Sequence, residues 1–154
     1  MRYIFFTKKQ KRMALLSLTQ IFVTLKAVNR FKTMKPINIK EKHALFSKQW
    51  HPHRIATLDN MQVLLAKLQG EFVWHSHDDE DELFQVIKGT LYMQFRDRTE
   101  IIKEGEIIVV PKGVEHNPTT KNNEEVHVLL FEKLTTAHTG NVIDDKTQTD
   151  YPEL

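Results

Sequence analysis

The chain has 154 residues, with 22 Lys and Arg against 20 Asp and Glu, and a formal net charge of +2. Hydrophobic residues at 40% and charged residues at 27% are typical of a globular protein, which argues against global disorder. The absence of cysteine excludes disulfides, thiol nucleophiles and Cys-ligated zinc, so a metal site must use His and carboxylate side chains. No apolar run reaches the length of about 18 residues that a transmembrane helix needs.

Charge divides the chain into a basic leader and an acidic body. Residues 1–40 carry ten basic side chains and no acid, whereas residues 41–154 carry 12 basic and 20 acidic side chains. We expect no nucleic-acid binding, because the body is acidic and the leader has no known binding pattern.

Three interpretations of the leader, residues 1–33, remain open. Its basic start and the more apolar residues 13–25 are typical of a secretory signal peptide, but no small-x-small cleavage site follows. The same composition suits a basic amphipathic helix that lies on a membrane or directs targeting. The interpretation that we favour is that the natural chain begins at Met34, which leaves a single domain, residues 34–154, with a charge of −6.

The body is a succession of short strand signals separated by turn residues such as Asp59-Asn60 and Lys88-Gly89. The predicted strands are residues 54–58, 61–68, 71–77, 82–87, 90–95, 100–102, 106–110 and 126–131. About eight short strands at regular spacing predict an all-β barrel or sandwich. Only residues 39–46 indicate a helix, and the polar tail, residues 135–154, is expected to run over the surface.

Four side chains in this pattern suit a metal site. His75 and His77 are two residues apart on a predicted strand, so their side chains point to the same face. Glu82 begins the return strand after a four-residue turn, and His116 follows a tight turn at residues 111–113 that can bring it back to the same place. Three His and one carboxylate leave open positions for water or substrate, as a catalytic metal site needs.

The other histidines have simpler explanations, and a His-x-His pair also occurs by chance on surface strands. His51-Pro-His53 has an intervening proline and no aligned carboxylate, so we expect it to be solvated. His127 is expected in the wall of the barrel, and no role is expected for His43 or His138.

The same residues resemble the two sequence motifs of the cupin superfamily. The matching positions are Gly70, His75, His77, Glu82, Gly89, Gly105, Pro111, Gly113 and His116. Four residues instead of five separate Gly70 from His75, and Thr120 stands where the second motif has asparagine. The chain also resembles small stand-alone cupins labelled as relatives of mannose-6-phosphate isomerase, including Thr139-Gly140-Asn141 in the tail.

The resemblance implies a jelly-roll β-barrel with a short N-terminal helix and a divalent metal ion held by His75, His77, Glu82 and His116. Ligand type alone does not choose among Fe, Mn, Ni, Co and Zn. Val73, Phe84 and Val86 share the pleat parity of His75, His77 and Glu82, and a small apolar-walled pocket is expected there.

Three functions remain open, because cupins of this pattern differ in what they do. The first is a metal-dependent enzyme with oxygenase or isomerase chemistry on a small organic molecule, with Glu82 as a possible base. The second is a non-catalytic module that binds a metabolite or metal, and the third is a metal-free epimerase-like enzyme using His and Asp. The resemblance also implies a homodimer through edge strands, and we expect a cytoplasmic protein without stable membrane insertion.

Overall fold

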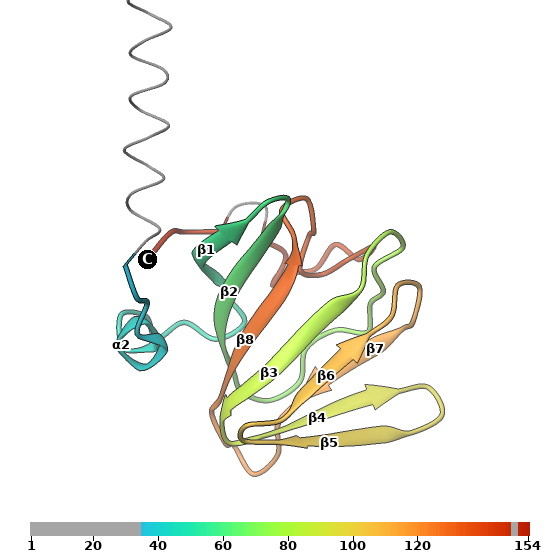
Figure 1. The fold of residues 1–154 in the computed structure, drawn as a ribbon. Helices are drawn as coiled ribbons and strands as arrows, with labels where there is room; N and C mark the ends of the chain where they lie inside the picture. The colour runs from blue at the N-terminus through green and yellow to red at the C-terminus, as the bar shows by residue number, and fades with distance from the viewer. Residues whose placement is uncertain (1–34, 149–150) are drawn as a thin grey trace, which may run out of the picture. The chain divides into compact units, whose positions relative to one another are not determined.

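Turn residues divide the described chain into one short helix and eight strands (Figure 1). The computed structural model describes residues 35–148 and 151–154, so the basic leader lies outside the described residues. The elements are α2 (Ile39–His43), β1 (His53–Leu58), β2 (Met61–Leu68), β3 (Glu82–Lys88), β4 (Thr90–Phe95), β5 (Thr99–Lys103), β6 (Ile107–Val110), β7 (His116–Thr119) and β8 (Val126–Lys133). No helix among these residues is long and apolar enough to cross a membrane.

The strands form two antiparallel sheets, as Figure 1 shows. The larger sheet has the order β1-β2-β8-β3-β6, and the smaller sheet has the order β5-β4-β7. The longest ladder joins β2 to β8, from Met61 opposite Lys133 to Leu68 opposite Val126. Two sheets built from non-consecutive neighbours agree with the predicted all-β jelly roll.

The core lies between the sheets because inward-facing residues alternate along the strands. On β3 the buried residues are Glu82, Phe84 and Val86, and on β8 they are Val126, Val128, Leu130 and Glu132. Glu82 is therefore the first inward-facing residue of β3, and Glu132 is the last inward-facing residue of β8. The other inward-facing residues of these two strands are apolar. This arrangement leaves two acidic side chains on the inward faces of β3 and β8.

The predicted elements need three corrections. The predicted strand at residues 71–77 forms only isolated bridges, at Glu71 and His75. The strand β7 was not predicted, because Pro118 interrupts its apolar pattern. The predicted helix at residues 39–46 is shorter and ends at His43.

The C-terminal tail runs over the surface only in part, since Thr135, Asn141, Ile143 and Asp145 are exposed as predicted but other residues of the tail are not. Thr136, His138, Thr139 and Tyr151 are all buried. The hydroxyl of Tyr151 donates a hydrogen bond to the carbonyl oxygen of Thr136 at 2.9 Å, which ties the end of the chain to the start of the tail. The prediction failed for these residues because their polar side chains pack against other polar groups instead of being exposed to solvent.

Candidate metal centre

His75 and His116 face each other across an isolated antiparallel bridge. The backbone N–H of His75 donates to the carbonyl of His116 at 3.0 Å, and the N–H of His116 donates to the carbonyl of His75 at 2.9 Å. Their ring centroids are 4.2 Å apart. Backbone pairing therefore brings together two imidazoles that lie 41 positions apart in the sequence.

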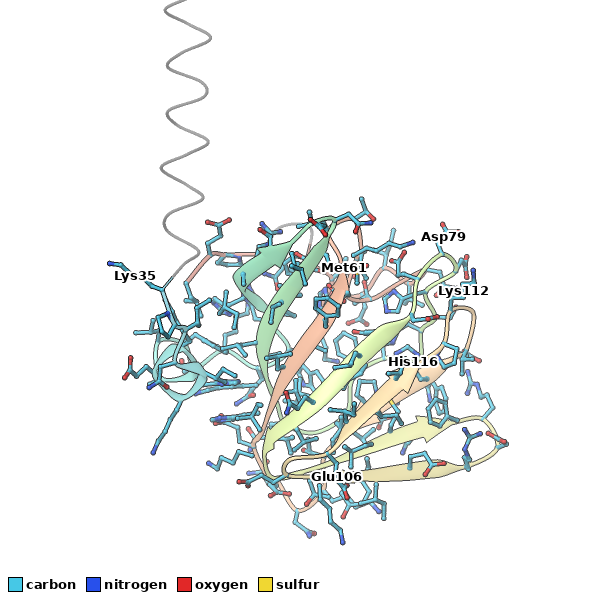
Figure 2. All side chains as sticks on the ribbon, viewed as in Figure 1. Lys35, Met61, Asp79, Glu106, Lys112 and His116 are labelled. Carbon is cyan, nitrogen blue, oxygen red and sulfur yellow. The ribbon has the colours of Figure 1, made fainter. Side chains whose placement is uncertain are left out.

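His77 and Glu82 reach the same place from the two sides of the acidic turn. The carbonyl of His77 accepts a hydrogen bond from the N–H of Gly113 at 2.7 Å, just before the turn into β7. Glu82 is the first residue of β3 and pairs with Val110, the last residue of β6. His116, which is labelled in Figure 2, is the first residue of β7.

The four predicted ligands converge on one buried point. His75, His77, Glu82 and His116 each offer one donor atom, and these atoms all lie within 4.8 Å of one another. The Nε2 atom of His77 lies 3.2 Å from the Oε2 atom of Glu82, and the Nε2 atom of His116 lies 3.4 Å from it. Two donors on one ion at about 2.1 Å would be separated by about 3.0–3.4 Å. Both separations therefore match donors that share a metal ion.

Three of these donor atoms lack other partners. The Nε2 atoms of His77 and His116 and the Oε2 atom of Glu82 are buried, and none makes a hydrogen bond of good geometry within the described residues. Leaving a buried polar atom unpaired costs about 1–3 kcal/mol. Three such atoms at one point fit a site that a cation completes.

The backbone fixes the tautomer of two of the rings. The Nδ1 atom of His75 lies 2.9 Å from the carbonyl oxygen of Val73, and the Nδ1 atom of His116 lies 3.0 Å from that of Val114. A carbonyl oxygen only accepts, so each Nδ1 carries the proton and each neutral ring keeps a lone pair on Nε2. A backbone carbonyl on the second nitrogen is the usual partner of a metal-bound imidazole.

Burial and neighbouring charge set the protonation of the site. Burial lowers the pKa of His75 to about 4, with a further decrease from His116, so this ring is neutral at pH 7. Burial opposes the charge of His77, but contact with Glu82 outweighs it and raises the pKa of His77. Burial likewise opposes ionisation of Glu82, yet contacts with His116 and His77 hold its pKa below the ordinary value. A lone-pair donor and an ionised carboxylate are the states that bind a cation.

A small cavity is lined by two of the four residues, His75 and Glu82. Its volume is about 30 Å³, which is space for about two water molecules. Its walls are apolar except at His75, Glu82 and His138 and are made by Trp50, Pro52, Ala66, Leu68, Phe72, Phe84, Pro118 and Leu130. The predicted apolar-walled pocket is present and Phe84 lines it as expected, but Val73 and Val86 are not among its lining residues.

Sequence reasoning missed Glu132, a second buried carboxyl in the barrel. Its Oε1 atom accepts a hydrogen bond from Nε2 of Gln62 at 3.1 Å, and the side chain of Gln62 is held in turn by Nε of Arg54 at 3.0 Å. Burial raises the pKa of Glu132 well above its ordinary value, and the charge of Glu82 raises it further. The alternation of β8 carried the signal, because it places Glu132 on the same face as Val128 and Leu130.

The histidines outside the candidate site are more buried than predicted. His53 is buried and stacks on Phe46, with ring centroids 4.2 Å apart. His51 is half-buried, so neither member of the pair that was predicted to be solvated is fully exposed. His43 is buried and stacks on His127 with centroids 4.6 Å apart. His127 lies in the barrel wall as predicted, half-buried on the face of β8 away from the core. None of these four histidine rings lies with the candidate ligands.

Comparisons with known proteins agree with the fold and the motif. The family model described as "Cupin domain" matches residues 61–132. A cupin-2 domain containing protein from Shewanella frigidimarina has 45% identity and a TM-score of 0.61, over 63% of this chain and 93% of that one. A crystal structure of a protein from Neisseria meningitidis has 33% identity and a TM-score of 0.58, over 64% of this chain and 99% of that one.

A curated relative matches a shorter stretch. The protein YdbB of Bacillus subtilis (strain 168) is 40% identical over 79 residues, which is 51% of this chain. The match spans 64% of the length of that relative.

Proposed function

The chain belongs to the cupin family, and on that premise we propose that it binds a divalent metal ion through His75, His77, Glu82 and His116. The observation that carries the proposal is the convergence of three buried donor atoms without hydrogen-bond partners among the described residues. The donors are nitrogen and oxygen atoms, which suit Fe, Mn, Ni, Co or Zn.

The metal centre would serve an enzyme that acts on a small organic molecule with oxygenase or isomerase chemistry. A bound ion supplies Lewis acidity or, if it is iron, the capacity to activate oxygen. The chain's own residues supply the rest: His75 and His116 are oriented by backbone carbonyls, and the apolar cavity walls keep bulk water away. Glu82 would serve as the base once it releases the metal, since it is ionised and lies at the cavity.

Two alternatives each have one supporting observation. The cavity holds only about two waters, which suits a non-catalytic module that binds a very small metabolite or the metal alone. The direct approach of His77 to Glu82, at 3.2 Å, suits a metal-free acid–base pair of the epimerase type. A metal centre accounts for more of the site than the metal-free pair, because that pair does not need all four side chains at one point. Turnover, and not the geometry of the ligands, separates the metal-dependent enzyme from a module that only binds the metal.

Elemental analysis of the full chain, purified without oxygen, separates these functions at their first step. We expect roughly one metal ion per chain in the wild type and a loss of most of it in His75→Ala, since a lost ligand weakens binding by more than the roughly 10–100-fold of a lost outer-shell partner. His51→Ala is the matched control from the other His-x-His pair and should keep its metal. An equal metal load in His75→Ala and the wild type would contradict the proposal.

Turnover assays then separate an enzyme from a binding module. Oxygen uptake and isomerase screens should show activity that a chelator removes. A full metal load without turnover on any substrate class would favour the non-catalytic module. Activity that survives the chelator in metal-free protein would favour the epimerase type.

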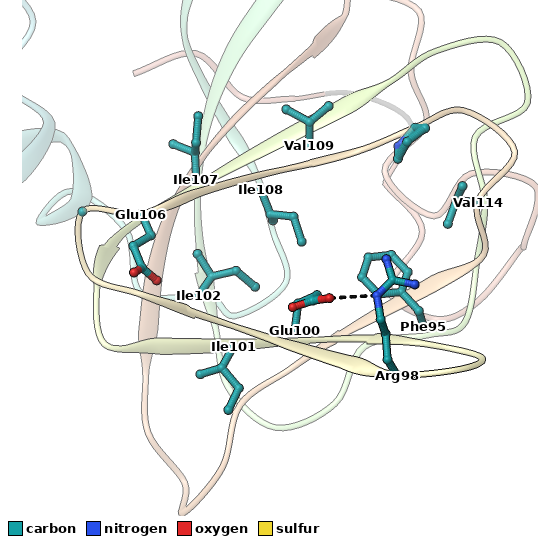
Figure 3. Close-up of a pocket in the computed structure, with 12 residues that line it drawn as sticks. Phe95, Arg98, Glu100, Ile101, Ile102, Glu106, Ile107, Ile108, Val109 and Val114 are labelled. Atoms are coloured by element: carbon teal, nitrogen blue, oxygen red, sulfur yellow. Dashed lines mark hydrogen bonds and ion pairs between the residues drawn. The ribbon is translucent and has the colours of Figure 1, made fainter.

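We also propose that two copies of the chain associate through the open edges of β5 and β6, which end their respective sheets. A groove of about 860 Å³ lies between these edges (Figure 3). Ile101, Ile107 and Val109 are 55%, 58% and 49% exposed there, although they are large and aliphatic. A second copy would cover them and pair the free backbone groups of the edge strands.

Sedimentation of the full chain tests this association. We expect a dimer in the wild type and a monomer in Ile107→Lys, because a lysine on an edge strand opposes strand pairing. Ile143→Lys is the control, since Ile143 is 94% exposed and lies in the tail, away from the groove. A wild-type monomer, or an Ile107→Lys dimer of unchanged stability, would contradict the proposal.

A further inference from the structure

His138 is a buried side chain that the metal site leaves without a role. It is 6% exposed, and neither of its ring nitrogens makes a hydrogen bond of good geometry within the described residues. The backbone of Lys146 and of Gln148 approaches the ring, but burial is the larger influence and lowers the pKa of His138. A buried, neutral imidazole with free nitrogens is costly unless another group completes it.

His138 lines the cavity that adjoins the metal ligands. His75 and Glu82 lie in the wall of the same cavity. The ring of Phe72 contacts both imidazoles, with centroid distances of 5.3 Å to His75 and 5.5 Å to His138. The cavity therefore has a further polar side chain, His138, in its wall beside the two candidate ligands, and the rest of the wall is apolar.

The tail holds His138 firmly in that position. The N–H of Asn141 donates to the carbonyl oxygen of Ser76 at 3.2 Å, and the N–H of Ser76 donates to Oδ1 of Asn141 at 3.3 Å. On the other side of His138, the hydroxyl of Thr136 donates to Oε1 of Glu80 at 2.8 Å. Both anchors lie in the segment that carries His75 and His77 and leads to Glu82, so the tail is fixed to the part of the chain that builds the site.

The charges and dimensions of the cavity limit what it can hold. Three neutral imidazoles and one carboxylate leave one positive charge on a divalent ion, and a buried charge favours a partner of opposite sign. A space for about two waters beside the ion leaves room for about two non-hydrogen atoms beyond the group at the metal, as in a two-carbon acid. Phe72, Phe84 and Leu130 favour a hydrocarbon body between the polar groups of such a molecule.

We propose that His138 contacts the substrate, forming a hydrogen bond to the second polar group of a small organic monoanion whose charged end lies at the metal. This inference rests on the proposed metal centre and adds to it the chemical class of the substrate. His138 acts as a specificity residue, since it distinguishes an anion with a second polar group from one without. Burial strengthens this selectivity, because a buried imidazole nitrogen without a hydrogen-bond partner cannot bond to solvent water instead.

The full chain loaded with Co(II) tests the proposal, with acetate and glycolate as probes that differ by one hydroxyl group. Binding of each is followed by the visible absorption of the cobalt. The wild type should bind glycolate more tightly than acetate by about three- to tenfold, the size of one neutral hydrogen bond. His138→Phe keeps an aromatic ring against Phe72 but removes both nitrogens, and His138→Gln restores a hydrogen-bonding group.

The expected result is that His138→Phe binds both acids equally, with its cobalt content and acetate affinity unchanged, and that His138→Gln recovers part of the preference. A glycolate preference that persists in His138→Phe would overturn the proposal, as would the failure of either acid to bind the wild type. Loss of cobalt from both His138 variants would also overturn it and would make His138 a support of the metal site. A wild type that does not load cobalt while folded would instead count against the metal centre itself.

Discussion

Gly140 in the tail packs directly against the main-chain carbonyl of Ser76, between the two histidines of the His-x-His pair. No side chain fits there, because a Cβ at residue 140 would overlap the Ser76 carbonyl and would also contact the ring of His75 at 3.4 Å. Gly140 moreover has φ of 53°, a conformation that L residues rarely adopt. We expect Gly140→Ala to lower the free energy of unfolding by about 2–5 kcal/mol and to weaken metal binding.

The variant Gly105→Ala is the control that separates the effect of the close contact from the effect of the positive φ angle. Gly105 also has positive φ, at 86°, but a Cβ there meets nothing within 4 Å. Its replacement should cost only about 1 kcal/mol or slightly more. Urea unfolding of the two variants, with metal content measured beside it, tests the comparison, and equal effects would show that the contact with Ser76 does not matter.

Glu82→Gln should weaken metal binding while leaving the fold intact. The change keeps the shape of the side chain but removes the one negative charge among the four candidate ligands. We expect the metal dissociation constant to rise by about 100-fold or more, since outer-shell changes alone cost 10–100-fold. Titration with Co(II) measures it. Glu100→Gln, at an exposed position on β5, is the control and should match the wild type.

Leu64→Ala should destabilise the barrel strongly. Leu64 is fully buried on β2, in the strand that pairs with β8 along its whole length. Removing a buried leucine side chain costs about 2–5 kcal/mol, through lost burial and the cavity that remains. Leu58→Ala removes the same atoms from a side chain that is 60% exposed and should cost about 0.5 kcal/mol or less. Similar denaturation midpoints for the two variants would contradict this assignment of the core.

The candidate site was predictable from sequence because its residues follow local rules. His75 and His77 are two residues apart, and Glu82 starts the next strand, so pleat parity was enough to group them. Grouping His116 with these residues also required the tight turn at residues 111–113, and the structure contains that turn. The same parity, applied to β8, would have placed Glu132 inside the barrel, but an acidic residue was not expected among Val128 and Leu130.

The tail was not predictable in this way, because its position depends on contacts far apart in the sequence. His138 and Gly140 lie in a polar segment whose composition is that of a surface loop. What positions them is the pairing of Asn141 with the backbone of Ser76 and the hydrogen bond from Tyr151 to Thr136. No local periodicity marks these contacts, and the fold of the barrel must exist before they can form.

His43 should make the stability of the protein fall at mildly acidic pH. Its ring is buried between α2 and the larger sheet, where burial lowers its pKa and the facing charges of His127 on β8 and Lys67 on β2 lower it further. The carbonyl of Ile39 and the backbone of Ala66 oppose this only in part. The unfolded chain therefore takes up a proton below about pH 6.5 that the folded chain does not, so the free energy of unfolding falls as the pH decreases.

The variant His43→Phe isolates this effect, since it keeps an aromatic ring stacked on His127 and cannot titrate. Urea unfolding between about pH 7 and pH 5 should show a smaller loss of stability in His43→Phe than in the wild type. Both proteins contain the other buried histidines, so the difference between their slopes belongs to His43. Identical slopes would mean that His43 becomes protonated as easily in the folded chain as in the unfolded one.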